Sequence, residues 1–249
     1  MSQEQPSSII FLPCGDTALS VEFGREVDPL INAQVMAFDE EIQKLRVSGE
    51  LSAIVETIPS FRAILISYDP FKIRQSEVIE ILKSIPVRKA EARKPTRVWE
   101  LPTCYDLEFG LDLEEVGQRC NKSVAEVTDL HSKADFQVYM LGFMPGLGYL
   151  GGLPDALELP RRSEPRVAVP LGSVAIAGKM SVIYPWESPG GWHVLGRTPV
   201  PLFDQNAERP VLLSAGDGVA FKSIDRKEYD DLAARISGGS FSSEELLKS

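Results

Sequence analysis

The sequence predicts an α+β protein in two parts, a small α+β layer followed by a β-barrel. Apolar periodicities of strand and helix alternate through residues 1–90 in the order β-β-α-β-β-α. Beyond Asp135 the helical period disappears, and short apolar runs alternate with Gly and Pro, which is typical of a closed or nearly closed barrel. We therefore expect domains at residues 1–90 and 96–236, followed by a flexible Gly/Ser-rich tail at 237–249.

The first part is expected to contain two strand pairs and two helices. Its strands are predicted at residues 8–12, 18–23, 51–58 and 61–68. Asp28 precedes Pro29 as an N-cap residue, and apolar residues then recur at helical spacing until Gly49. A second amphipathic helix is expected at 76–85, before Pro86. Residues 88–95 are charged and end in proline, as in a linker.

The second part should begin with a strand at 97–104 and a short helix at 112–120. Ser123 and Glu126 form a capping box for a third helix, which ends near His131, where an imidazole can favour the helix dipole. A last helix is expected at 226–236. Between them, short strands are predicted at 167–169, 173–177, 181–184, 192–195, 211–213 and 219–224.

Composition excludes several classes of function. The chain has 249 residues and a formal charge of -10, which argues against non-specific binding to nucleic acid or to an anionic membrane. The N-terminus lacks the features of a signal peptide, so we expect a cytoplasmic protein. Three widely spaced cysteines indicate reduced thiols. Two histidines exclude a histidine-rich metal site, whereas a carboxylate-bound Mg²⁺ stays open.

Residues 136–154 contain the spacing G-x-G-x-x-G, at Gly146, Gly148 and Gly151. A dinucleotide fingerprint needs its third glycine in the first turn of a helix. Here Gly152 and Pro154 follow, and both oppose a continuing helix. The sequence therefore predicts a shaped binding or packing loop after a buried strand.

A series of motifs stands in one order through the second part, and further motifs lie near both ends of the chain. They include Phe143-Met-Pro-Gly146, Tyr149-Leu-Gly-Gly-Leu-Pro154, Pro160-Arg-Arg162, Gly172-Ser-Val174, Ser188-Pro-Gly-Gly-Trp192 and Leu195-Gly-Arg-Thr-Pro199. In these motifs the chain resembles the allophanate hydrolase subunit 1 family, also described as carboxyltransferase subdomain C and D. The resemblance covers nearly the whole sequence.

This resemblance implies a cyclophilin-like fold for the barrel and a shared enzymatic role. The best-supported activity in the family is ATP-dependent opening of 5-oxo-L-proline to L-glutamate. That activity involves a second barrel subunit of the C type, which is allophanate hydrolase subunit 2-like, and a LamB/YcsF-type subunit. The resemblance thus implies a hydrolase subunit that is inactive alone. The cofactor of the assembled complex would be ATP, either by itself or together with Mg²⁺. Two alternatives stay open: a histidine-kinase inhibitor like KipI, and a urea or allophanate carboxyltransferase component.

Opening a lactam with ATP needs groups that hold anions and polarise a carbonyl, and the chain has no P-loop lysine motif. The candidate anion-binding side chains are Arg161, Arg162, Arg166 and Arg197, since guanidinium groups bind carboxylates and phosphates bidentately. The alternative for each arginine is a pair with Glu158, Glu164 or a backbone carbonyl. Replacing Arg162 and Arg166 by Ala is expected to abolish activity of the complex with little loss of fold.

The other candidates lie close to these arginines in the sequence. His193 and Lys179 are the candidate catalytic residues, although a histidine in a strand can equally be a hydrogen-bonded core residue and Lys179 a solvated one. Tyr149 and Tyr184 could line a pocket or belong to the core. We expect residues 188–192 to form a tight loop in which Ser188, Gly190 and Gly191 approach a ligand or partner, because adjacent glycines permit positive φ.

Overall fold

The computed structural model describes residues 9–87, 94–95 and 97–248. The chain divides into two compact units, Met1–Lys94 and Pro95–Ser249, which are considered separately. Most of the segment predicted as a linker, residues 88–95, lies outside the described residues.

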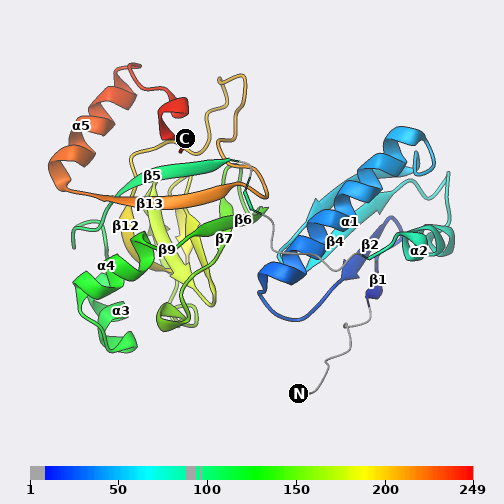
Figure 1. The fold of residues 1–249 in the computed structure, drawn as a ribbon, viewed down its shortest axis with the longest axis horizontal. Coiled ribbons are helices and arrows are strands. Elements are labelled where there is room, and N and C mark those ends of the chain that lie inside the picture. Colours follow the sequence, from blue (N-terminus) through cyan, green and yellow to red (C-terminus); the bar gives the residue numbers. More distant parts are fainter. Residues whose placement is uncertain (1–8, 88–93, 96, 249) are drawn as a thin grey trace. The chain divides into compact units, whose positions relative to one another are not determined.

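The first unit is a four-stranded antiparallel sheet with two helices packed against it (Figure 1). The strand order in the sheet is β1-β2-β4-β3. The order of elements along the chain confirms the predicted β-β-α-β-β-α pattern. The elements are β1 (Ile10–Cys14), β2 (Ala18–Glu22), α1 (Pro29–Ser48), β3 (Ile54–Pro59), β4 (Ala63–Tyr68) and α2 (Gln75–Ser84).

Helix α1 begins and ends where the sequence predicts. The Asp28 side chain accepts hydrogen bonds from the backbone N–H groups of Leu30 (2.7 Å) and Ile31 (3.0 Å). Gly49 ends the helix with φ 91°, a conformation that glycine adopts without steric cost. Val35, Phe38 and Ile42 then face the sheet as part of the core of this unit.

The second unit is a closed barrel, which confirms the predicted α+β fold class. Neighbouring strands follow the order β10-β7-β6-β13-β5-β12-β9. Figure 1 shows β5 and β13 side by side, and this pair is parallel while the other pairs are antiparallel. The barrel strands are β5 (Val98–Cys104), β6 (Phe136–Leu141), β7 (Gly148–Gly151), β9 (Ser173–Ala177), β10 (Met180–Ile183), β12 (His193–Arg197) and β13 (Gly218–Ile224).

One side of the barrel carries a second apolar layer on its outer face. Strand β9 is buried on both faces: Val174 and Ile176 belong to the barrel core, and Ala175 and Ala177 to a separate outer cluster. A two-stranded ribbon of β8 (Arg166–Val169) and β11 (Ser188–Gly190) contributes Val169 to that cluster. Burial on both faces explains the nearly continuous apolar sequence of β9.

Three α-helices accompany the barrel: α3 (Leu113–Cys120), α4 (Val124–Ser132) and α5 (Arg226–Ser237). The Ser123–Glu126 capping box of α4 is confirmed. The predicted dipole role of His131 is wrong, because its side chain is fully buried between Tyr105 and Ser181. No helix of the described ranges is long and apolar enough to cross a bilayer.

The glycine-rich stretch 136–154 forms a hairpin. Residues 148–151, expected in a loop, form strand β7 and pair with β6. Gly151 is required there because a Cβ would lie 2.0 Å from the Tyr139 ring. Gly152 has φ 104°, and the chain continues into a 3-10 turn, η1 (Asp155–Leu157), without an α-helix. The rejection of a dinucleotide fingerprint is therefore confirmed.

Three other expectations are wrong. Residues 188–190 form β11 in place of a loop, and neither Gly190 nor Gly191 has a positive φ. Residues 211–213 form no strand, only a bridge from Val211 to Phe203. The tail from 237, expected to be flexible, is attached to the barrel near its end, because Leu246 is buried in the barrel core cluster and the Lys248 N–H donates to the Val98 carbonyl at 2.9 Å.

Candidate functional site

A cavity of about 340 Å³ opens on the outer face of the barrel, beside β7 and β10. Its volume lies at the lower end of the range for small-molecule sites, which is about 300–1,000 Å³. Five of the residues singled out in the sequence line it: Tyr149, Arg161, Tyr184, Gly190 and Gly191. The remaining lining residues are Phe143, Leu147, Pro165, Val182, Pro189 and Trp192.

The two tyrosines supply hydroxyl groups to this apolar cavity. Burial raises the pKa of Tyr184 to about 12, and it raises the pKa of Tyr149 as well. Both phenols are therefore protonated at neutral pH and can donate a hydrogen bond. Within the described part of the chain, neither hydroxyl has a protein hydrogen-bond partner.

Arg161 brings a positive charge to the cavity. Its guanidinium carbon lies 5.8 Å from the centre of the Trp192 ring, which also lines the cavity. The side chain is exposed and forms no ion pair with any described residue. Since no acidic residue lines the cavity, its lining carries a net charge of one positive unit.

The glycines allow close approach within the cavity wall. A Cβ at Gly190 would lie 2.3 Å from the Tyr184 hydroxyl oxygen, so a larger residue would displace that phenol. Across the cavity, Phe143 is 71% exposed and has φ 70°, a strained conformation for a residue with a Cβ. An exposed aromatic ring thus stands at the edge of the cavity.

Arg162 and Arg166 do not line the cavity. Both bind the carboxylate of Asp112, which is 2% exposed. The two oxygens of Asp112 accept from the Arg166 Nη1 and Nη2 atoms at 2.7 and 2.6 Å, from Arg162, and from the Val194 N–H at 2.7 Å. Both arginines, predicted to bind an external anion, have this internal carboxylate as a partner in the structure.

The sequence patterns do not identify Asp112 as a site residue. The available signal was its position at the start of a predicted helix, and it is indeed the N-cap residue of α3. Its side chain, however, makes no capping hydrogen bond and turns instead to the arginines. Nothing in the linear sequence relates position 112 to positions 162 and 166, because the contacts span fifty residues or more.

Ligand atoms of Asp112, Glu115 and His193 lie within 4.8 Å of one another, a combination that can hold a metal ion. The donor set does not fit a cation here. Both Asp112 oxygens are occupied by guanidinium and backbone donors, and Glu115 also accepts from Arg162 at 3.0 Å. Asp112 and Glu115 instead form an ion-pair cluster with Arg162 and Arg166.

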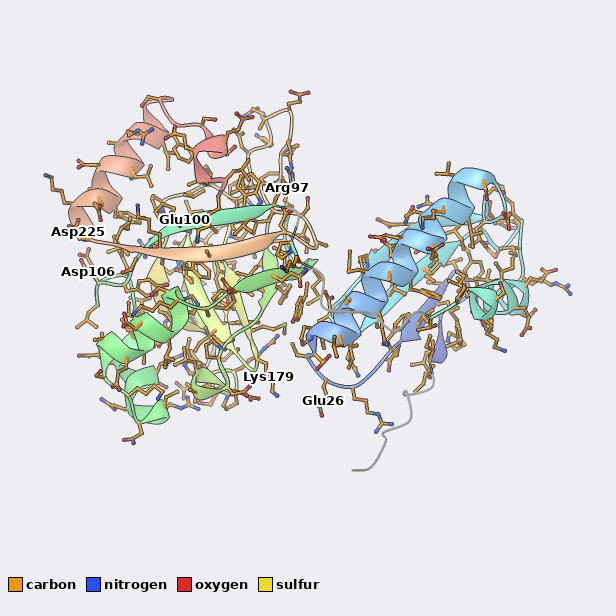
Figure 2. The ribbon with its side chains drawn as sticks, viewed as in Figure 1. Glu26, Arg97, Glu100, Asp106, Lys179 and Asp225 are labelled. Atoms are coloured by element: carbon orange, nitrogen blue, oxygen red, sulfur yellow. The ribbon has the colours of Figure 1, made fainter. Side chains whose placement is uncertain are left out.

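The other predicted site residues do not line the cavity. His193 is fully buried, its Nε2 lies 3.0 Å from the Pro160 carbonyl oxygen, and its Nδ1 has no partner among the described residues. Lys179 lies at the turn between β9 and β10, 4.0 Å from Glu158 (Figure 2). Arg197 stacks over Phe109 at 4.7 Å and lines another cavity. Ser188 is half-buried on β11 and does not line the cavity.

Fold and site together define a class: a two-unit α+β protein whose closed barrel carries a small, positively charged cavity on its outer face. Residues 9–213 match the model of the carboxyltransferase domain, subdomain C and D. The chain belongs to this family.

The chain is similar both to 5-oxoprolinase B subunits and to urea amidolyases. The chain is 37% identical over 226 residues to the B subunit of 5-oxoprolinase from Bacillus subtilis, covering 86% of this chain and 92% of that protein. It is 27% identical to the urea amidolyase of Lachancea kluyveri, covering 94% of this chain but 14% of that much longer protein.

A solved structure of a protein named TTHA0988 superposes with a TM-score of 0.71 and 34% identity. The match covers 84% of this chain, which spans about two fifths of that protein, 40% of its length.

Proposed function

We propose that this chain is the B-type subunit of a cytoplasmic ATP-dependent 5-oxoprolinase, which opens 5-oxo-L-proline to L-glutamate with ATP hydrolysis. The observation that carries the proposal is the 37% identity to a 5-oxoprolinase B subunit over 92% of that protein's length. The cavity agrees with such a role, because it combines one cation, two hydroxyl donors and apolar walls at a size suited to a small ring.

The chain is expected to need partners. One cationic side chain lines the cavity, whereas a nucleoside triphosphate is usually bound by several cationic side chains together with Mg²⁺. We therefore assign ATP to the assembled complex, formed with a C-type subunit, which is allophanate hydrolase subunit 2-like, and a LamB/YcsF-type subunit. His193 and Lys179 stay candidates for catalysis only if assembly brings substrate to them, since neither lines the cavity.

Reconstitution tests this proposal. The chain alone is expected to release no phosphate from ATP, whereas the three-subunit mixture should hydrolyse ATP and form glutamate when 5-oxo-L-proline is added. Phosphate and glutamate are measured in parallel, with each subunit omitted in turn as the control. A well-assembled complex whose ATP hydrolysis does not respond to 5-oxo-L-proline would contradict the proposed function.

A second candidate function is a component of a urea or allophanate carboxyltransferase. The observation that favours it is the relationship to urea amidolyase along 94% of this chain. It predicts carboxyl transfer to urea from a partner that carries carboxylated biotin, which returns to free biotin on the partner, and no response to 5-oxo-L-proline. Turnover measured with both substrates on the same preparation separates the two functions.

A further inference from the structure

We propose that the outer-face cavity binds a small ring compound that carries one carboxylate and one ring carbonyl. Arg161 pairs with the carboxylate, and the Tyr149 and Tyr184 hydroxyls donate to the carbonyl. The choice of lactam as probe rests on the proposed function, but the chemistry of the site stands on the residues that line the cavity.

Charge distribution assigns the ligand a single carboxylate. Three arginines occur in residues 160–166, and two of them are neutralised by buried Asp112 and by Glu115. The charge of Arg161 is uncompensated, because the side chain forms no ion pair with the described residues and lies over the Trp192 ring. One uncompensated guanidinium in a cavity without acidic residues suits one carboxylate.

The two tyrosine hydroxyls indicate that the second polar group of the ligand is a hydrogen-bond acceptor. Both hydroxyls are protonated donors, since burial raises both pKa values, and neither donates to a described protein group. A carbonyl oxygen accepts two hydrogen bonds, so the two phenols of the cavity match one ring carbonyl in number. The aromatic rings of Trp192 and the tyrosines add apolar surface to the cavity wall.

Asp112 is linked to the cavity wall through two arginines. Arg162 and Arg166, which Asp112 holds, flank the segment whose Pro165 lines the cavity. The Arg162 backbone N–H also donates to the Gly191 carbonyl at 2.8 Å, which joins two parts of the cavity wall. Asp112 is therefore connected through Arg162 to the backbone next to Arg161.

Binding to the full chain tests the proposal with three probes. 5-oxo-L-proline has both groups, cyclopentanecarboxylate has only the carboxylate, and 2-pyrrolidinone has only the lactam. We expect 5-oxo-L-proline to bind most tightly by titration calorimetry. Arg161→Met should lower the affinity for 5-oxo-L-proline and cyclopentanecarboxylate, which both carry a carboxylate, by about tenfold or more. The affinity for 2-pyrrolidinone should not change. Tyr184→Phe should lower the affinity for the two lactams, 5-oxo-L-proline and 2-pyrrolidinone, about threefold to tenfold. The affinity for cyclopentanecarboxylate should not change.

The control is Arg235→Met, which removes an exposed arginine that pairs with Glu245 outside the cavity and should change no affinity. The proposal is wrong if Arg161→Met leaves both carboxylate binding by the chain and the KM for 5-oxo-L-proline in the complex unchanged. A complex that hydrolyses ATP with an unaltered KM in Arg161→Met thus refutes this site but keeps the proposed function. Arg161-dependent binding of carboxylates without any 5-oxo-L-proline-dependent ATP hydrolysis keeps the site and refutes the proposed function.

Discussion

The Asp112→Asn variant is expected to lose about 3–5 kcal/mol of unfolding free energy, as happens when one member of a buried ion pair is removed. Asp112 is 2% exposed and accepts from two guanidinium groups and from the Val194 N–H. Asparagine keeps the shape but leaves Arg166 without its counter-charge and Arg162 with Glu115 alone, and both arginine side chains are only 22% exposed. Urea unfolding measured at neutral pH gives the free energy.

Glu115→Gln is the matched control, because Glu115 pairs with the same Arg162 but has a side chain that is 45% exposed. Exposed ion pairs contribute about 1 kcal/mol or less, so this variant should stay close to wild type. If Asp112→Asn also stays within about 1 kcal/mol of wild type, burial does not set the strength of this cluster, and the prediction is wrong.

The same geometry corrects the expectation for Arg162 and Arg166. Their joint replacement by Ala was expected to cost little stability, as for exposed charges. The structure shows that both side chains are mostly buried against Asp112, whose charge would be left uncompensated. Lost activity in that double variant would therefore report lost structure, whereas Arg161→Met separates binding from folding.

Acid should destabilise the barrel unit through His131. The His131 side chain is fully buried, and this burial lowers its pKa to about 3. Ser181 Oγ lies 3.1 Å from the Ala175 carbonyl, so its proton points there and the oxygen accepts from His131 Nε2–H at 3.1 Å. Nδ1 then accepts from the Tyr105 hydroxyl at 2.8 Å. A second proton on this imidazole would have to break that hydrogen bond.

The sign follows from this neutral state. The folded pKa lies below the unfolded value of about 6.5, so the contribution to stability is complete above that value and is lost as pH falls toward about 3. Between pH 7 and pH 4 the loss from this one group is about 3 kcal/mol.

The measurement is the unfolding free energy from urea titrations between pH 4 and pH 7. The other titrating groups are shared with a His131→Gln variant, so the difference between the two pH profiles isolates the imidazole. His131→Gln should be less stable at pH 7 yet lose less stability on acidification. Parallel profiles would show that His131 does not titrate in this way.

Local patterns were sufficient to predict the architecture. Asp28, Pro29 and Gly49 determine where α1 begins and ends, and the Ser123–Glu126 capping box determines the start of α4, because capping depends on residues a few positions apart. The change from helical to short strand periods after Asp135 was enough to predict a barrel.

The sequence also singled out five residues of the cavity, namely Tyr149, Arg161, Tyr184, Gly190 and Gly191. Their residue types were informative by themselves: aromatic rings, an arginine beside proline, and adjacent glycines.

Only the tertiary structure shows which arginine side chains are paired internally and which can bind a ligand. Arg161 and Arg162 are neighbours in the sequence, yet one lines the cavity and the other binds Asp112. His131 looked like a helix-end residue and lies in the core, while the tail from 237 packs on β5. These outcomes depend on contacts between residues that are far apart in the sequence, such as His131 with Ser181 and Asp112 with Arg162, and only folding brings such groups together and removes them from water.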